Sequence, residues 1–296
     1  MRKKVLMLVV LLIAAITVVV YFNWPSDPQE HSNTTDETTN NQTESEDETA
    51  EEEQTEEPEE DSSISSHVRE AVMEALHFFK KDAHIVAIGD SLTQGVGDEE
   101  ENGGYVGVLE EQLDNQSINV SIDNFGKRGN RTDHLLKRLE QEEIQDSLKK
   151  ADTVLITIGA NDIMKIMKDN FVNLTEEPFI EGRGPYGERL TAIFDKITSL
   201  QPDAKIYLIG FFNPFEQYFG EIEALNQIIT RWNNKSLEVT NQFEQVQYIP
   251  MQDVFQNETE NVYADDNFHP NHRGYQLIAE RVITYLENNL RQAEEE

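Results

Sequence analysis

The amino-acid sequence predicts an α/β fold in which a five-stranded parallel β-sheet has helices on both faces. Short apolar segments typical of buried strands alternate with longer segments of helical periodicity over residues 84–291. The loops between them are short, and a strand that follows such a crossover helix normally runs parallel to the strand before it. The sequence has no internal repeat.

Each expected strand combines Val or Ile with other apolar residues in a run of four to six, and each expected helix has apolar residues spaced among charged ones. In chain order, the expected strands are His84–Gly89, Val120–Phe125, Val154–Gly159, Lys205–Gly210 and Val246–Ile249. The expected helices are Tyr105–Leu113, Thr132–Leu148, Tyr186–Leu200, Ile222–Phe243 and Gly274–Arg291.

Residues 1–24 have the pattern of an uncleaved membrane anchor. Three positive charges among the first four residues precede Val5–Phe22, a run of 18 residues without a charge. As a helix this run is roughly 27 Å long, close to the roughly 30 Å thickness of the bilayer hydrocarbon. The positive charges favour the cytoplasmic side, so everything after Trp24 is expected outside the cytoplasm. The alternative is a cleaved signal peptide, although the large residues that end the run do not fit a cleavage site.

Residues Pro25–Ser63 are expected to form a disordered acidic tether. They include 16 Asp or Glu and no Lys or Arg, and their few apolar residues cannot offset the entropy cost of ordering the chain. Residues Ile64–Glu296 then form one domain, which is long enough to bury a full hydrophobic core.

Composition excludes several classes of protein and site. The chain has 24 Lys and Arg against 57 Asp and Glu, and its net charge of −33 argues against binding to nucleic acid or to anionic lipid. The absence of cysteine excludes disulfides, thiolate metal sites and a cysteine nucleophile. None of the seven histidines has the spacing of a metal site, so neither a metal nor another cofactor is expected.

Polar and glycine-rich segments lie where a parallel sheet forms its sites, at the carboxyl ends of the strands. Gly89–Gly97 follows the first expected strand, Asn124–Thr132 spans the end of the second, and Gly159–Asp162 follows the third. Asp266–Pro270 precedes the last helix. These four segments are expected to meet at one edge of the sheet.

Together the four segments contain a serine nucleophile and the groups that would support it. Ser91 lies in a Gly-flanked turn where its hydroxyl can be exposed, His269 could accept its proton, and Asp266 could orient the imidazole. The backbone N–H groups of Ser91 and Gly129 and the side-chain amide of Asn161 could stabilise a developing oxyanion.

Each of these residues also has a purely structural interpretation. A Gly-Asp-Ser sequence is often only a turn, Asn161 could cap the next helix, and His269 could be a surface residue before Pro270. The catalytic interpretation is favoured because all four signals occur at the expected strand ends.

The four segments resemble the signature blocks of the SGNH, or GDSL-type, esterase and lipase hydrolases. Gly89–Gly95 resembles the first block, and Asn124–Thr132 resembles the glycine block. Gly159–Asp162 resembles the third block, and Asp266–Pro270 resembles the final Asp-x-x-His block. The chain closely resembles the membrane-anchored, lysophospholipase-like bacterial members of this family.

This resemblance implies a three-layer, flavodoxin-like α/β/α fold and a set of catalytic roles. Ser91 is expected to be the nucleophile, His269 the base and Asp266 its orienting residue. The oxyanion hole is expected to consist of Ser91, Gly129 and Asn161.

Three features bear on the substrate. Lys127-Arg128 stands where small or apolar residues are more usual, so it either favours an anionic substrate or pairs with a carboxylate. The aromatic segment Phe211–Phe215 either lines an acyl pocket or packs in the core. Phe171–Gly184 is longer than a plain connection, and whether it is a lid stays open.

The expected function is that of an extracytoplasmic serine esterase or lipase that acts on lipid-type acyl esters. The alternatives are a deacetylase of cell-wall glycans, an acyltransferase with the same triad, and a non-catalytic envelope binding module. The expected partners are an acyl lipid or acylated envelope component and, through Val5–Phe22, the cell membrane. No nucleic acid is expected.

Overall fold

The structure is a computed structural model that describes residues 83–100, 103–115, 120–214, 223–256 and 258–295. The predicted anchor Val5–Phe22 and the predicted tether Pro25–Ser63 lie outside the described residues. Within the described ranges, no helix is both long enough and apolar enough to cross a membrane.

The five expected strands form one sheet. β1 (Ala83–Gly89) lies between β2 (Val120–Gly126) and β3 (Thr153–Thr157), and the sheet continues through β4 (Lys205–Ile209) to β5 (Val246–Ile249). All four strand pairs are parallel. The order β2-β1-β3-β4-β5 is that of a flavodoxin-like sheet, so the predicted fold class is confirmed.

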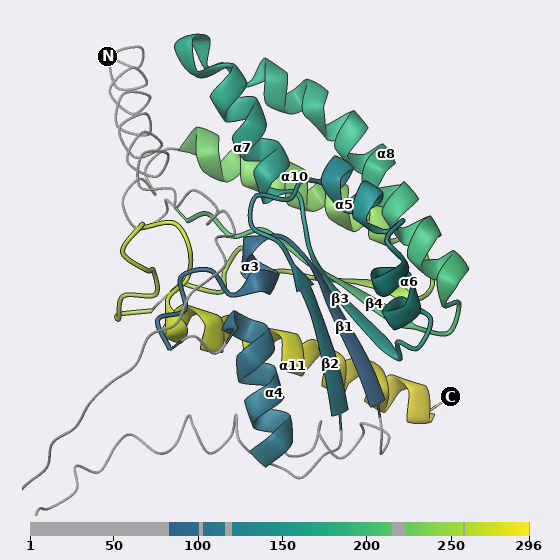
Figure 1. The fold of residues 1–296 in the computed structure, drawn as a ribbon. Helices are drawn as coiled ribbons and strands as arrows, with labels where there is room; N and C mark the ends of the chain where they lie inside the picture. Colours follow the sequence, from purple (N-terminus) through teal and green to yellow (C-terminus); the bar gives the residue numbers. More distant parts are fainter. Residues whose placement is uncertain (1–82, 101–102, 116–119, 215–222, 257, 296) are drawn as a thin grey trace, which may run out of the picture. The chain divides into compact units, whose positions relative to one another are not determined.

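Helices cover the two faces of the sheet as separate layers (Figure 1). On one face, α4 (Gly104–Asn115) packs against α11 (His272–Glu295). The helices of the other layer are, in chain order, α5 (Thr132–Arg138), α6 (Glu142–Leu148), α7 (Ala160–Asp169), α8 (Glu177–Leu200) and α10 (Glu223–Thr240).

Strand side chains alternate between the two layers. Ile85 of β1 belongs to a buried cluster with Tyr105 of α4 and Tyr275 of α11. Its neighbour Val86 is also fully buried and, because successive side chains point to opposite faces, packs toward the other layer. Burial on both faces explains why β1, β3 and most of β4 are nearly continuous apolar runs, whereas the edge strand β2 is only partly buried.

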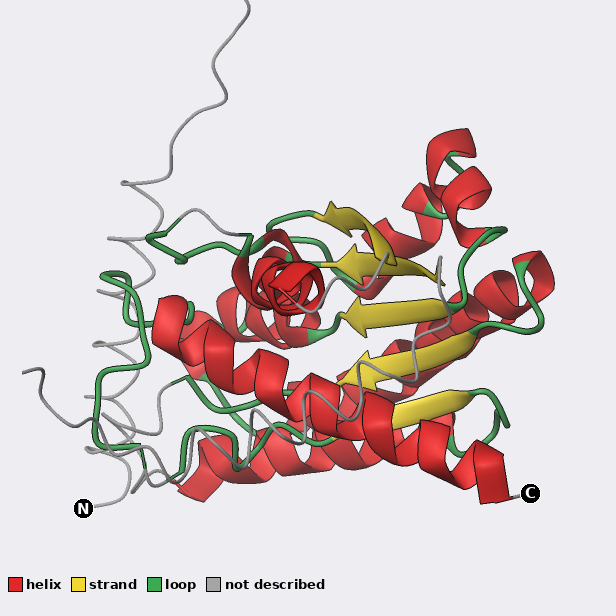
Figure 2. Cartoon of the chain, turned by 90° about the horizontal axis from the view of Figure 1, so that it is seen from below, coloured by secondary structure: helices red, strands yellow, loops and turns green. Residues whose placement is uncertain are grey.

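The carboxyl ends of the strands lie at one edge of the sheet, where the yellow arrowheads of Figure 2 point. The chain moves outward from β1 to β2 and then in the opposite direction through β3, β4 and β5. Such a reversal leaves a crevice outside the ends of β1 and β3. The short helix α3 (Ser91–Gln94) begins at this edge, directly after β1.

Two helices occupy the segment where the sequence predicted one, Thr132–Leu148. α5 ends at its C-cap Leu139, whose N–H donates to Leu135 O at 3.0 Å, and Gln141 is the N-cap of α6. The intervening residues include no Gly or Pro. The apolar periodicity of the sequence therefore continues across the break between α5 and α6 and does not reveal it.

Helix α8 begins at Glu177 rather than at the predicted Tyr186. Two prolines and two glycines in this stretch favour a loop, but tertiary packing overrides them. Phe179 is buried, and its carbonyl accepts a hydrogen bond from the Trp232 indole at 3.2 Å. Much of Phe171–Gly184 is therefore the packed start of α8, preceded by a short 3₁₀ helix at Phe171–Asn173.

Candidate active site

Ser91 is the first residue of α3 and not part of a simple turn. Asp90 is the N-cap of this helix, and its carboxylate accepts a hydrogen bond from Leu92 N at 3.1 Å. Ser91 is 7% exposed, so it is largely shielded from solvent. Its backbone N–H is at the N-terminus of the helix, where an intrahelical acceptor does not exist.

His269 and Asp266 share one tight turn before α11. Asp266 Oδ1 accepts hydrogen bonds from Phe268 N at 3.0 Å and His269 N at 2.9 Å. Asn267 has φ 53° in this turn, the left-handed region that Asn tolerates better than most residues. A β-bridge between Tyr263 and Pro270 closes the loop around it. This local geometry explains the Asp-x-x-His spacing.

The structure brings Ser91, His269 and Asp266 into one hydrogen-bonded chain. His269 Nε2 lies 3.1 Å from Ser91 Oγ, and His269 Nδ1 lies 2.5 Å from Asp266 Oδ2. Because an ionised Asp266 can only accept, Nδ1 carries a proton, and the neutral imidazole presents Nε2 to the serine as an acceptor.

Electrostatics keep Asp266 ionised. Burial alone would raise the pKa of Asp266, but the hydrogen bond and electrostatic attraction of the His269 ring together with backbone N–H donors outweigh it and lower that pKa to about 2. The side chain of His269 is 7% exposed and that of Asp266 is 27% exposed. The pair is therefore shielded enough for its hydrogen bond to hold the imidazole in one orientation.

Gly129 and Asn161 lie at the same edge of the sheet. Gly129 follows β2 with φ 75°, and a side chain there would contact nothing within 4 Å. Asn161, in the first turn of α7, donates one Nδ2 hydrogen to Asn130 O at 3.0 Å. The second Nδ2 hydrogen remains for another acceptor. In the described part of the chain, the N–H groups of Ser91 and Gly129 have no protein acceptor.

The loop after β2 is attached directly to the nucleophile helix. Gly126 packs so closely against α3 that a side chain there would overlap the backbone of Gln94. Arg128 N donates to Gln94 Oε1 at 2.6 Å, and Lys127 N donates to Gly89 O at 3.0 Å. These contacts hold the segment that carries Gly129 against the end of β1 and α3. Lys127 is exposed and Arg128 is half-buried next to the same helix.

Asn161 does not cap α7. The N-cap is Gly159, with φ 117°, and Asn161 lies within the helix. The expected strand Val154–Gly159 accordingly ends earlier, at Thr157. The structural interpretation of Asn161 as a cap is therefore wrong.

Sequence reasoning missed a second set of residues that supports this site. Asp162 is buried and bonded to Thr132 and Arg189. Arg138 donates to Phe125 O at 2.8 Å and to Asn130 Oδ1 at 3.3 Å. These partners come from the end of β2, the loop after it and the helices α5, α7 and α8, so no local spacing marks them. The only signal in the sequence is the position of Asp162 directly after Asn161.

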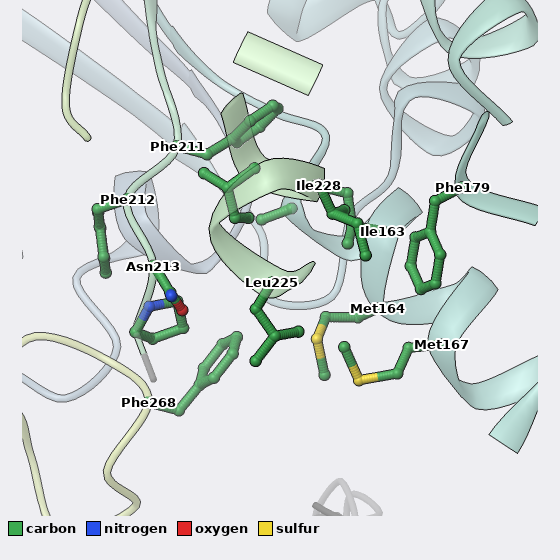
Figure 3. A pocket seen from close by; sticks show the side chains of 13 residues that line it. Ile163, Met164, Met167, Phe179, Phe211, Phe212, Asn213, Leu225, Ile228 and Phe268 are labelled. Atoms are coloured by element: carbon green, nitrogen blue, oxygen red, sulfur yellow. The ribbon is translucent and has the colours of Figure 1, made fainter. Parts of the chain in front are cut away.

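An apolar pocket adjoins the catalytic turn (Figure 3). Ala160, next to Asn161, and Phe268, next to His269, are among its 13 lining residues, of which only Asn213 is polar. Its volume is about 50 Å³, several times the about 10–15 Å³ that one water molecule needs. The remaining lining residues are Ile163, Met164, Met167, Phe179, Phe211, Phe212, Pro214, Leu225, Ile228 and Ile229.

The fold and this hydrogen-bonded Ser-His-Asp geometry define a serine hydrolase of the three-layer α/β class. The sequence matches the GDSL-like Lipase/Acylhydrolase family over residues 87–277. The chain belongs to this family and is a GDSL-type ester hydrolase.

Two relatives and one solved structure illustrate the similarity. YpmR of Bacillus subtilis (strain 168), described as uncharacterized, is 38% identical over 212 residues, which cover 70% of this chain and 83% of YpmR. The spore germination lipase LipC of Bacillus licheniformis is 28% identical over 204 residues, 66% of this chain and 92% of LipC. The lipase Lip_vut3 from a goat rumen metagenome has a TM-score of 0.62 and 25% identity, over 70% of this chain and 99% of its own.

Proposed function

We propose that this protein hydrolyses lipid-type acyl esters, such as lysophospholipids, on the extracytoplasmic side of the cell membrane. Ser91 is the nucleophile, His269 the general base and Asp266 the residue that orients it. The Ser91 and Gly129 N–H groups and the Asn161 side chain form the oxyanion hole. The observation that carries the lipid preference is the apolar pocket beside the catalytic turn.

The first half of the reaction forms an acyl-enzyme. His269 Nε2, 3.1 Å from Ser91 Oγ, takes the hydroxyl proton as Oγ attacks the ester carbon. The carbonyl oxygen becomes an oxyanion and accepts hydrogen bonds from the three donors. The imidazolium, stabilised by the Asp266 carboxylate, then gives its proton to the leaving alcohol as the carbon–oxygen bond breaks.

The second half repeats these steps with water. His269 removes a proton from a water molecule, whose oxygen attacks the carbonyl carbon of acyl-Ser91. The new oxyanion occupies the same hole, and collapse returns the proton to Ser91 Oγ and releases the fatty acid. An alcohol in place of this water would make the reaction an acyl transfer.

The pocket supports an acyl chain longer than acetyl. Its walls come from α7, α8, α10 and the segment after β4, and their side chains converge on one space in Figure 3. The single polar lining residue, Asn213, has its amide engaged with Asn226 Oδ1 at 2.7 Å. The wall therefore offers a bound chain apolar contact and no polar group that would have to be desolvated. The Phe211–Phe215 segment thus contributes Phe211 and Phe212 to the pocket.

The membrane location rests on the sequence outside the described residues. The uncharged run Val5–Phe22 after a basic N-terminus supports a single-pass anchor, and the acidic segment Pro25–Ser63 supports a tether that lets the hydrolase domain reach the surrounding lipid or envelope. The similarity to LipC, which is a lipase by name, supports the same substrate class.

The nucleophile is tested by labelling and by substitution in the full chain. A fluorophosphonate probe should label wild type and not Ser91→Ala. Ser91→Ala and His269→Ala should each lower kcat by about 10⁴-fold or more, Asp266→Ala less, and double variants little further because the three act as a unit. Wild-type turnover by Ser91→Ala would refute the serine mechanism.

The acyl preference is tested with a series of esters that differ only in acyl length. Each buried CH₂ contributes about 0.8 kcal/mol, so kcat/KM should rise about fourfold per methylene beyond acetyl until the pocket is filled. Ile229→Trp, which fills the pocket, should abolish this rise and spare the acetyl ester. Leu237→Trp, on the same helix but 40% exposed and outside the pocket, is the matched control.

The competing functions predict different results from the same series. Fastest turnover of the acetyl ester would favour the glycan deacetylase, and ester products formed with added alcohols would favour the acyltransferase. Absence of both labelling and turnover would favour a binding module.

A further inference from the structure

Asp162 has no part in the proton transfers, yet it is one of the most fully bonded carboxylates near the site. Its Oδ2 accepts from Thr132 N at 2.9 Å, and its Oδ1 accepts from Thr132 Oγ1 at 2.6 Å and Arg189 Nη2 at 3.0 Å. The side chain is 5% exposed. Arg189 Nε also donates to Thr132 Oγ1 at 2.6 Å, so the three side chains form a closed ring of hydrogen bonds.

The ring joins the two segments that carry oxyanion donors. Asp162 directly follows Asn161 in α7, and Thr132, the first residue of α5, comes three residues after Gly129. The two segments also meet directly, where Asn161 Nδ2 donates to Asn130 O at 3.0 Å. The Asp162 carboxylate therefore fixes how far apart the Gly129 N–H and the Asn161 amide lie.

A negative charge suits this position better than a neutral amide does. Asp162 is in the first turn of α7, where the helix dipole favours an anion, and Arg189 provides a charge-assisted hydrogen bond. All three groups that contact the carboxylate are donors. An Asn side chain would point its NH₂ at one of them and lose that contact.

We propose that Asp162 is a positioning residue that sets the geometry of the oxyanion hole through Thr132 and Arg189. This inference rests on the proposed roles of Gly129 and Asn161. A misplacement of about 1 Å in such a site can cost about a hundredfold in rate, so the ring acts on the transition state more than on substrate binding.

The test compares kcat and KM of variants in the full chain, with active enzyme counted by fluorophosphonate titration. Asp162→Asn should lower kcat by about 10- to 100-fold and change KM by less than about threefold. Thr132→Val, which loses only the hydroxyl, should lower kcat in the same direction, and Thr132→Ser should restore it. If Asp162→Asn does not fold, the comparison of Thr132→Val with Thr132→Ser tests the proposal in its place.

A double-variant cycle separates positioning from general damage. In an Asn161→Ala background, where one of the positioned donors is already lost, the effect of Asp162→Asn on kcat should be at least about threefold smaller. Ser147→Ala is the matched control, because Ser147 is 7% exposed and bonds to Asp123 of β2 and to His84 at the amino end of β1. It should lower the melting temperature and leave kcat unchanged.

Two results would overturn the inference while the proposed function stands. One is wild-type kcat in folded Asp162→Asn, with Ser91→Ala inactive. The other is an equal loss of kcat from Asp162→Asn in the wild-type and Asn161→Ala backgrounds, which would mean general structural damage. Failure of wild type both to hydrolyse any ester and to react with the probe would instead overturn the proposed function, and this inference with it.

Discussion

At the scale of single residues, the catalytic turn and its distant serine differ in how far sequence can predict them. Asp266 and His269 are three residues apart, and one turn brings both to the same side. Ser91 joins them from 178 residues away, a contact that only the expected meeting of strand ends could suggest. The sequence did not predict the ring formed by Asp162, Thr132 and Arg189, because its members belong to three helices and have no shared period.

Asn161→Asp distinguishes an oxyanion donor from a structural amide. The new carboxylate repels the developing oxyanion, so kcat should fall by at least about a hundredfold, more than in Asn161→Ala. Because the side chain also donates to Asn130 O, a carboxylate there should cost about 1–3 kcal/mol of stability. Steady-state kinetics and thermal melting measure the two effects. Near-normal turnover would leave the hole to the Ser91 and Gly129 amides alone.

Asp90 is a buried carboxyl group beside the nucleophile that has not been given a catalytic role. Burial raises the pKa of Asp90 to about 7, although hydrogen bonds from Thr157 and Leu92 partly offset this rise. Thr157 Oγ1 donates to Asp90 at 2.8 Å and lies 2.7 Å from Thr93 Oγ1, which in turn lies 3.1 Å from the Tyr105 hydroxyl. The site is thus a closed polar network with little solvent.

This raised pKa predicts a pH-dependent stability. Above about pH 4 an unfolded Asp90 loses its proton, whereas the folded group retains it until about pH 7, so the free energy of unfolding falls as pH rises through this window. Asp90→Asn keeps the helix cap and should remove up to about 4 kcal/mol of that fall. Urea unfolding of both proteins from pH 4 to 8 gives the difference directly. A difference that is constant with pH would contradict the prediction.

At the scale of elements, the strands were predictable and the helix boundaries were not. β1 and β3 are buried on both faces and are therefore short apolar runs, whatever their neighbours, whereas the edge strand β2 is only partly buried. The start of α8 depends on Phe179 packing beside Trp232 in a distant helix, which overrides the local preference of Pro and Gly for a loop. The sequence of α8 alone does not predict the contact between Phe179 and Trp232.

Gly126, the last residue of β2, and Gly129, in the loop that follows, should give opposite results when each is replaced by Ala. Gly126→Ala would overlap the backbone of α3, so we expect a loss of about 3 kcal/mol or more of stability together with a large fall in kcat. Gly129 has open space around it, and Ala there meets only the cost of a positive φ, about 1–2 kcal/mol. Its N–H remains, so turnover should largely survive. Equal effects of the two changes on kcat would contradict this account of how the loop is attached to α3.

At the scale of the whole molecule, the site and its pocket occupy one edge of the described fold. The apolar pocket adjoins the catalytic turn through Phe268 and the first turn of α7, which carries Asn161, through Ala160. Parallel topology explains this concentration, since every strand delivers its following loop to the same edge. That rule made the location of the site predictable. The shape of the pocket was not predictable, because it depends on side chains from α7, α8 and α10.

The sequence predicts that Val5–Phe22 holds the chain at the membrane. If Val5–Phe22 spans the bilayer with its basic end inside, the intact protein should sediment with membranes and resist extraction by salt or carbonate. Protease added to protoplasts should cut within Pro25–Ser63 and release an active, fluorophosphonate-reactive fragment, because a segment of this acidic, apolar-poor composition is expected to be open to cleavage. A variant with Leu11→Arg and Leu12→Arg places two charges in the middle of the run, each costing about 2.5–3.5 kcal/mol, and should not insert. A chain that is protected from protease on intact protoplasts would place the domain in the cytoplasm, and a soluble chain whose N-terminus begins near Trp24 would show cleavage in place of anchoring.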